Sequence, residues 1–432
     1  MSQGVRKGAT YALLGQGAAS IFLFLFQMFA GRWIGVESYG LLNVLYSSIF
    51  IVSVLIISGI VQGLIRYIAY FEAKGDDTGI KQTIQTSLII YIIFLFIIII
   101  LSLIFKTILL NKLFNLEFTI LLQYLIGLFG LSLFRFYLGI LQGYRKFHIF
   151  SFGIGVKEFI MFIILLLIVK IMRLSVIEVG WSITVSPFIA LLFIWRAVKN
   201  NHTILNWNKD FSLNIKIIKF ILMVGVISLM NQWVIRAGPL ILKIIGGDKA
   251  DYNAGLFSAI IMPLNLARTV VVALLTGLYP NLSRAYSMKN DNLIRRYIMR
   301  SSGIVVIIIM FIIPVFYFTG PLIVKILYGN DYIVPRSDTF ILSLVVSFFL
   351  LGMLFSKIIM ARGTPKYSAI SFFIGIIGLI CVLIWVDLPP LKLVEAGLLI
   401  CNFLYASIQI AYLFIIKLKR HLENQKLKDR LS

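Results

Sequence analysis

Long apolar stretches recur along the whole chain, separated by short polar or basic segments. A helix rises about 1.5 Å per residue, so about 20 apolar residues cross a hydrocarbon core of about 30 Å. About twelve stretches are long enough and are expected to be spanning helices. They are Tyr11–Trp33, Leu41–Ile65, Ser87–Phe105, Thr119–Gln142, Phe150–Val169, Val176–Trp195, Ile217–Ile245, Gly255–Pro280, Gly303–Tyr317, Phe340–Ala361, Tyr367–Val386 and Val394–Ile416. Pro314, Gly320 and Pro321 are expected to interrupt the ninth.

The composition agrees with a chain that lies mostly in lipid. Of the 432 residues, 60% are hydrophobic and only 13% are charged, which is far from the balance of a soluble domain. We therefore predict an all-α membrane protein. Cys381 and Cys401 fall inside apolar stretches and are interpreted as small hydrophobic residues, not as a disulfide or metal pair.

The net charge of +23 comes from basic residues in short clusters between the spans, and it does not indicate nucleic-acid binding. About 25 of the Lys and Arg residues fall on the side of the termini and about 10 on the other side, counted over loops and span ends. The positive-inside rule then places both termini in the cytoplasm of a multi-pass protein of the cell membrane. The loops on the outer side are short, which leaves no room for a catalytic domain there.

The two halves of the chain carry matching motifs at offsets of about 211 to 220 residues. The pairs are Arg32–Gly35 with Lys243–Gly246, Tyr39–Leu41 with Ala254–Leu256, Arg66 with Arg284, and Gly143–Phe147 with Gly363–Tyr367. Each half holds six spans, so we predict two six-helix lobes related by a pseudo-twofold axis along the membrane normal, with a cavity between them. The expected divisions are an N-terminal lobe over 1–196, a cytoplasmic linker over 197–216, a C-terminal lobe over 217–416 and a basic cytoplasmic tail over 417–432.

One stretch carries a charge near the middle of the membrane. Arg268 lies about twelve residues from the nearer end of Gly255–Pro280, too deep to reach an interface easily. Pro263 is expected to break the helix close by. Polar residues share one face of this helix beside Arg268: Ser258, Asn265, Thr269 and Thr276. A water-filled functional cavity is favoured over an arginine held by structural carbonyl groups.

Two further stretches present a polar face at helical spacing. The seventh carries Ser228, Gln232 and Arg236, and the first carries Gln27. Arg236 is interpreted as lining the cavity, with contact to the outer membrane surface as the alternative.

Lys157 and Glu158 are adjacent opposite charges inside the fifth stretch. As neighbours they point about 100° apart and need not pair with each other. Glu158 is taken as the one carboxylate in the membrane and hence as the one candidate for protonation-linked coupling, although a structural ion pair is the favoured role. Arg135 and Lys357 are expected to extend toward the cytoplasmic surface.

The sequence carries no pattern typical of catalysis. It lacks a phosphate-binding G-x-x-x-x-G-K-[ST] loop and an H-E-x-x-H pair, and no acidic pair in a span is placed to hold a metal. We therefore expect neither an enzyme nor a cofactor. Five basic residues against one acidic residue inside the spans favour an anionic ligand.

Four segments resemble the oligosaccharide flippases, the polysaccharide-transporter branch of the multidrug/oligosaccharidyl-lipid/polysaccharide exporter superfamily. The segments are Gly31–Leu41 (GRWIGVESYGL), Gly59–Ala69, Leu327–Tyr332 (LYGNDY) and Ala361–Lys366 (ARGTPK). The resemblance implies alternating access between two six-helix lobes and transfer of a polyprenyl-diphosphate-linked glycan to the outer leaflet. It also implies basic residues lining the cavity between the lobes, in agreement with Arg268 and Arg236. The protein is expected to act as a monomer in the lipid bilayer, beside the machinery of glycan biosynthesis.

Two alternatives remain open at this point. A multidrug exporter of the same superfamily takes organic cations and needs carboxylates in the membrane, and one acidic residue beside five basic residues disfavours it. A membrane glycan polymerase or ligase is expected to carry a substantial outer loop with catalytic residues, and the sequence has none.

Overall fold

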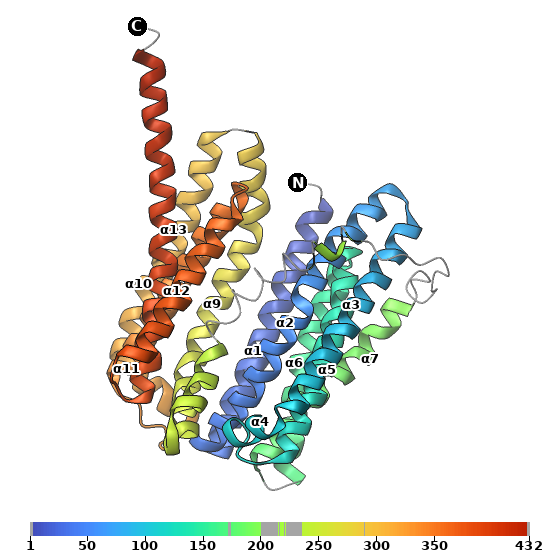
Figure 1. The fold of residues 1–432 in the computed structure, drawn as a ribbon, viewed down its shortest axis with the longest axis vertical. Coiled ribbons are helices and arrows are strands. Elements are labelled where there is room, and N and C mark those ends of the chain that lie inside the picture. The colour runs from blue at the N-terminus through green and yellow to red at the C-terminus, as the bar shows by residue number, and fades with distance from the viewer. Residues whose placement is uncertain are drawn as a thin grey trace. The chain divides into compact units, whose positions relative to one another are not determined.

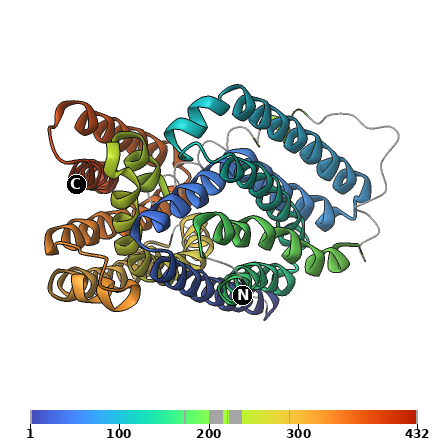
Figure 2. The same ribbon diagram turned by 90° about the horizontal axis from the view of Figure 1, so that it is seen from below.

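The computed structural model describes residues 3–171, 174–199, 215, 217–219, 221, 236–288 and 290–429. These residues form helices joined by turns and loops, and no strand occurs among them (Figure 1 and Figure 2). Within this part of the chain, 11 helices are long and apolar enough to cross a membrane. They match the predicted stretches other than Ile217–Ile245, most of which lies outside the described residues. The prediction of an all-α membrane protein is confirmed.

The helices of the first half are α1 (Gln3–Ile34), α2 (Val36–Lys74), α3 (Asp77–Ile104), the short α4 (Lys106–Lys112), α5 (Phe118–Gly143), α6 (Phe147–Ile171) and α7 (Val176–Lys199). Residues 236–245 are helical and lead into the 3₁₀ turn η1 (Gly247–Lys249). The remaining helices are α9 (Ala250–Ser287), α10 (Asp291–Tyr328), α11 (Arg336–Ala361), α12 (Pro365–Trp385) and α13 (Pro390–Asp429).

Two helices continue through the prolines at which the sequence predicts a break. Helix α10 continues from Asp291 to Tyr328 through Pro314 and Pro321, and α9 continues through Pro263. A proline removes one backbone hydrogen bond of a helix, but in lipid a chain that left the helix would expose many more polar groups. The predicted interruptions at Pro314 and Pro321 and the predicted break at Pro263 are therefore wrong.

The chain divides into two compact units. The first holds residues 1–262 and 324–333, and the second holds residues 263–323 and 334–432. The first unit thus contains α1 to α7, the beginning of α9 and the end of α10. The second contains the rest of α9 and α10 together with α11, α12 and α13.

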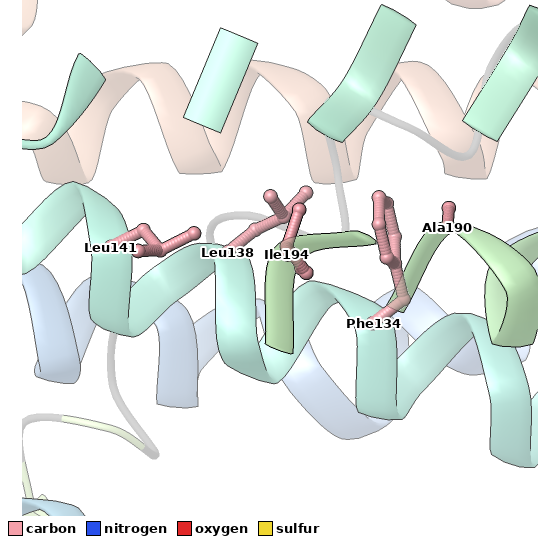
Figure 3. Packing of buried hydrophobic residues seen from close by; sticks show 5 residues of the cluster. All are labelled: Phe134, Leu138, Leu141, Ala190 and Ile194. Atoms are coloured by element: carbon pink, nitrogen blue, oxygen red, sulfur yellow. The ribbon is translucent and has the colours of Figure 1, made fainter. Parts of the chain in front are cut away.

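In the first unit, helix pairs pack along their length. Helix α1 lies against α6, where the Phe22 and Phe159 ring centroids are 5.0 Å apart, and α2 lies against α5. Helix α5 also packs on α7 through an apolar cluster (Figure 3). Its buried members are Phe134, Leu138, Leu141, Ala190 and Ile194. This packing holds α5 in place beside the polar residues described below.

Two repeat-related glycines bring α2 and α9 into backbone contact in the first unit. A Cβ atom on Gly40 would lie 1.8 Å from the carbonyl oxygen of Asp251, and one on Gly255 would lie 2.1 Å from that of Val36. Only glycine allows such a close approach. Gly40 and Gly255 occupy matching positions in the two halves of the sequence, and equivalent residues are expected to meet beside a twofold axis.

Tyrosines from two of the motif segments meet in the same unit. The hydroxyl groups of Tyr39 and Tyr328 lie 3.5 Å apart, and the Tyr332 hydroxyl donates to the carbonyl oxygen of Gly31 at 2.7 Å. Burial raises the pKa of Tyr332, which lies in the turn after α10, so its hydroxyl keeps the proton that it donates. These motif segments hold helix ends together.

In the second unit, α13 packs against both α11 and α12. Helices α12 and α13 are antiparallel, because Gly397 faces Leu379 while Gly375, earlier in α12, faces Cys401, later in α13. The Phe372 and Tyr405 rings pack edge to face between the same two helices, with centroids 5.6 Å apart. The three helices form a bundle with polar residues buried inside it.

Candidate functional site

Two arginines meet at one aromatic ring in the first unit. The guanidinium carbon Cζ of Arg135 on α5 lies 4.4 Å from the ring centroid of Phe50 on α2, and that of Arg236 lies 4.8 Å from the same centroid. Arg236 also lies 4.6 Å from the Tyr46 ring, one helical turn earlier in α2. We call Arg135, Arg236, Tyr46 and Phe50 the arginine–aromatic cluster. It pairs each cation with the negative face of a π-system in place of a carboxylate.

The position of Phe50 shows which way Arg135 extends. Gly127 of α5 faces Ile49 of α2, and Gly139 faces Leu64, so the two helices run in the same direction. Phe50 therefore lies level with the residue after Gly127, well before Arg135. Side chains on a helix lean toward its N-terminus, and Arg135 reaches back in that direction. Its expected extension toward the nearer helix end at Gly143 is wrong.

The two guanidinium groups repel each other. Because both lie within 5 Å of the Phe50 centroid, their Cζ atoms are at most about 9 Å apart, and at an effective dielectric constant of about 20 this costs about 2 kcal/mol or more. An anion bound to both guanidinium groups would relieve the repulsion and accept paired N–H donors from each. The cluster is thus suited to phosphate or carboxylate.

Lys157 and Glu158 form an ion pair on α6. The Nζ of Lys157 lies 2.8 Å from a carboxylate oxygen of Glu158, and both residues are buried. The two neighbours thus pair with each other although their directions on the helix do not require it, since a buried charge without a partner is costly. Glu158 also acts electrostatically on Arg135, as does Arg236. The arginine–aromatic cluster and its surroundings together hold three cations, Arg135, Arg236 and Lys157, and one carboxylate, Glu158.

Gln27 adds a polar group with unused hydrogen-bonding capacity on α1. Its side chain is fully buried, and neither its Nε2 nor its Oε1 has a hydrogen-bond partner within the described part of the chain. A buried amide in that state costs free energy unless a ligand or water satisfies it. Since α1 packs along α6, Gln27 lies on a helix adjoining the Lys157–Glu158 pair.

The other predicted site residues are placed differently. Asn265 and Arg268 lie on α9 in the second unit, where both are half-buried, and the Thr269 hydroxyl donates to the carbonyl oxygen of Asn265 at 3.1 Å. Ser228 and Gln232 lie outside the described residues. The structure thus brings Arg236 close to Arg135, which was not among the predicted site residues. The missed signal is the lean of helical side chains toward the N-terminus, which directs Arg135 away from the nearer helix end.

A second buried ion cluster, which sequence analysis missed, lies in the second unit. Lys392 of α13 forms ion pairs with Asp338 at the start of α11 and, at 3.7 Å, with Glu395 one turn further along α13. Both carboxylates are buried. Glu395 falls inside the predicted stretch Val394–Ile416, so Glu158 is not the only carboxylate in a span. We call Asp338, Lys392 and Glu395 the acidic cluster.

Solved structures with this fold are membrane transporters. An inward-facing multidrug resistance MATE family transporter of the MOP superfamily matches with a TM-score of 0.76 at 18% identity, covering 94% of this chain and 99% of its own. An outward-facing one matches with a TM-score of 0.69 at 17% identity, covering 95% and 97%. A MOP superfamily transporter from Pyrococcus furiosus, described by the reverse polarity of its binding pocket, matches with 0.68 at 17%, covering 95% and 97%. This chain therefore has the MOP-transporter fold.

A family model gives the narrower assignment. The model described as "Polysaccharide biosynthesis protein" matches residues 5–286, and the chain belongs to this family. A search of curated proteins finds no match. The chain is therefore a helical membrane protein of the polysaccharide biosynthesis family, with the fold of the MOP transporters.

Proposed function

We propose that this transporter is a flippase that moves a polyprenyl-diphosphate-linked oligosaccharide from the cytoplasmic to the outer leaflet. The arginine–aromatic cluster carries the proposal. It holds two guanidinium groups beside one ring, with a third cation nearby and one carboxylate already paired to it. A diphosphate is the anionic part of such a lipid, and moving it through hydrocarbon without partners would be prohibitive. Membership of a polysaccharide biosynthesis family supports a glycan as its cargo.

The proposed contacts to the substrate divide by chemistry. Arg236 and Arg135 bind the diphosphate oxygens, because a guanidinium group offers two parallel N–H donors that match them. Lys157, which is paired with Glu158, offers further N–H donors to the phosphate, and the free amide of Gln27 binds a sugar hydroxyl or a phosphate oxygen. Further contacts are proposed from the sequence argument alone: Arg268, Asn265, Gln232 and Ser228.

Alternating access supplies the transport step of the proposal. The same fold occurs in an inward-facing and an outward-facing MATE transporter, so it accommodates both states in those relatives. The headgroup enters from the cytoplasm and leaves outside, while the prenyl tail remains in lipid. If the loaded carrier moves net negative charge, an inside-negative potential favours its export by about 2.3 kcal/mol per charge per 100 mV.

A multidrug exporter is the second candidate, because the MATE neighbours are named for multidrug resistance. Organic cations would be repelled by the two guanidinium groups of the arginine–aromatic cluster. The acidic cluster of the second unit is the observation that favours this candidate, since its carboxylates outnumber Lys392.

Transport by the purified protein in liposomes distinguishes the two. The flippase proposal expects a fluorescent polyprenyl-diphosphate oligosaccharide to cross the bilayer and a cationic dye to stay where it is. Deletion of the gene should leave a lipid-linked glycan on the cytoplasmic leaflet. Movement of the dye without movement of the lipid-linked glycan would replace the proposal by the multidrug exporter.

The proposed orientation in the cell membrane is tested by labelling single cysteines. In a Cys381→Ala, Cys401→Ala background, cysteines at Gly247 and Asp387 should react with an impermeant thiol reagent added to intact cells. Cysteine at Asn290 should react only after the cells are opened, because the positive-inside rule places it in the cytoplasm. Labelling at Asn290 in intact cells would contradict the predicted cytoplasmic position of this loop.

A further inference from the structure

The acidic cluster holds one more carboxylate than its lysine can neutralise. The ammonium group of Lys392 bonds directly to Asp338 and also donates to the Ser337 hydroxyl at 2.7 Å. Ser337 in turn donates to Asp338 at 2.9 Å. Asp338 lies in the first turn of α11, where the helix dipole also favours a negative charge. Asp338 is therefore the carboxylate that stays ionised.

Glu395 has no close cation or hydrogen-bond donor among the described residues to balance a negative charge on its carboxylate. Its side chain is fully buried, the nearest cation is Lys392 at 3.7 Å, and neither carboxylate oxygen has a hydrogen-bond partner in the described part of the chain. An ionised carboxylate in this state would be strongly disfavoured, whereas a protonated one is neutral. On α12, the titratable residue at the level of Glu395 is Cys381.

A file of buried amides continues from Glu395 along the same face of α13. Asn402 and Gln409 follow at intervals of seven residues, or two helical turns, and both are buried. The side-chain oxygen of each has no hydrogen-bond partner in the described residues, while the Nε2 of Gln409 donates to the Ser371 hydroxyl of α12 at 3.1 Å. These unused acceptors are a second indication that protons or water reach the interior of this bundle.

We infer that Glu395 is a proton-binding site of the transport cycle, reached from the aqueous phase beside Lys392. A proton from water adds to a carboxylate oxygen of Glu395 to form the neutral acid, and its release restores the carboxylate. The Lys392 side chain is 30% exposed and marks the route to the surface. Its ammonium group already occupies the place between the two carboxylates that a metal cation would need. The inference rests on the transporter fold and not on the identity of the substrate.

Proton binding is measured directly by infrared spectroscopy of the full-length protein in lipid. A buried, protonated carboxyl group gives a carbonyl stretching band that a carboxylate lacks. The band should be present at neutral pH, vanish in Glu395→Gln and persist in Glu158→Gln, the matched control in which the other buried glutamate is removed. A band absent from the unchanged protein, or lost in Glu158→Gln instead, would overturn the assignment.

A second variant tests the cause of the protonation. Asp338→Asn releases Lys392 to pair with Glu395, so the midpoint at which the band disappears should move to lower pH. An unchanged midpoint would show that Lys392 does not control Glu395. Replacing potassium chloride by sodium chloride should leave the band unaltered. Its loss in sodium would identify a metal cation as the ligand and overturn the proton site.

Coupling to transport is tested in liposomes with the fluorescent polyprenyl-diphosphate oligosaccharide. An imposed pH gradient should speed transport by the unchanged protein severalfold, and Glu395→Gln should lose this stimulation. Equal stimulation of both proteins would overturn the coupling role. If the unchanged protein does not move this lipid at all, the flippase proposal fails, and the infrared band still decides whether Glu395 binds a proton.

Discussion

The two charged clusters of the protein leave charges of opposite sign in excess. The arginine–aromatic cluster of the first unit leaves positive charge in excess and rests its guanidinium groups on Phe50 and Tyr46. The acidic cluster of the second unit leaves negative charge in excess around Lys392. Excess charge in a low-dielectric interior must be met by a ligand or by a change of protonation. An arginine keeps its proton and needs an anion, whereas a carboxylate takes up a proton.

On the two proposals above, the two units have different roles. The first unit has the chemistry to hold an anionic cargo, and the second has the chemistry to bind and release a proton. Lys157 and Glu158 illustrate the neutral case, in which a direct 2.8 Å contact leaves little charge to be met. Four kinds of substitution should break or sharpen this contrast, and the first has the largest expected effect.

Removing either guanidinium group should have the largest effect. Arg236→Ala and Arg135→Ala should each slow transport of the lipid-linked oligosaccharide about tenfold to a hundredfold, because a hydrogen bond to a charged group contributes about 1.5–3 kcal/mol. Arg236→Lys should keep part of the activity, since the charge remains while the paired donors are lost. Initial rates in liposomes measure this effect.

An exposed arginine over an aromatic ring serves as the matched control. Arg66 lies on the surface of α2 with its Cζ 5.5 Å from the Tyr67 ring centroid. Arg66→Ala should transport at the normal rate. Normal transport by Arg135→Ala as well would exclude the arginine–aromatic cluster from substrate binding.

Removing the lysine of the acidic cluster should destabilise the second unit. Lys392→Ala leaves the buried carboxyl groups of Asp338 and Glu395 without a cation, which costs about 3–5 kcal/mol when the lost partner is fully buried and less here, because Lys392 is partly exposed. Protonation of these carboxylates is then favoured in the folded state, so the lost stability should return as the pH falls. Thermal unfolding of the variant in detergent at several pH values measures both effects. Equal destabilisation at every pH would contradict the electrostatic explanation.

Replacing the shared aromatic ring should have a moderate effect. Phe50→Leu keeps an apolar side chain but removes the π face under both guanidinium groups, at a cost of about 0.5–2 kcal/mol per contact. Transport should fall severalfold, less than in either arginine variant. Phe129→Leu is a suitable comparison, because that ring packs on Phe188 at 5.9 Å and contacts no cation among the described residues. A similar loss in both variants would point to packing alone.

An exposed carboxylate should give the smallest effect. The Thr78 hydroxyl and the backbone N–H of Gly79 hydrogen-bond to Asp76 at the start of α3 and lower the pKa of its carboxyl group. The ionised cap stabilises the protein above the ordinary pKa of aspartate, and this contribution is lost as the pH falls through the lowered value. Asp76→Ala should lower the unfolding temperature slightly at neutral pH and not at strongly acidic pH. An effect as large as that of Lys392→Ala would remove the distinction between exposed and buried carboxylates.

The sequence alone predicts the spanning helices and the repeat of the two halves. Helices such as α3 and α12 are recognisable because their apolar stretches match the thickness of a bilayer, a requirement that depends on length and composition only. The repeat was visible in the matched glycines of Tyr39–Leu41 and Ala254–Leu256, and the structure places Gly40 against the start of α9. Proline was misleading in α9 and α10, because lipid enforces the helix despite one missing hydrogen bond.

What the sequence by itself determined, then, is an all-helical transporter fold with basic residues inside the membrane, since lipid leaves a chain of this composition few other structures. Only the tertiary structure decided which charges meet. The sequence places Arg135 near the membrane surface, whereas the structure sets its guanidinium group beside Phe50. The pairing of Lys392 with Asp338, which leaves Glu395 without a close cation, follows from the packing of α13 on α11. The partner of a buried charge is set by the rotation and register of neighbouring helices. Those depend on packing between residues far apart in the chain, which a single sequence does not display.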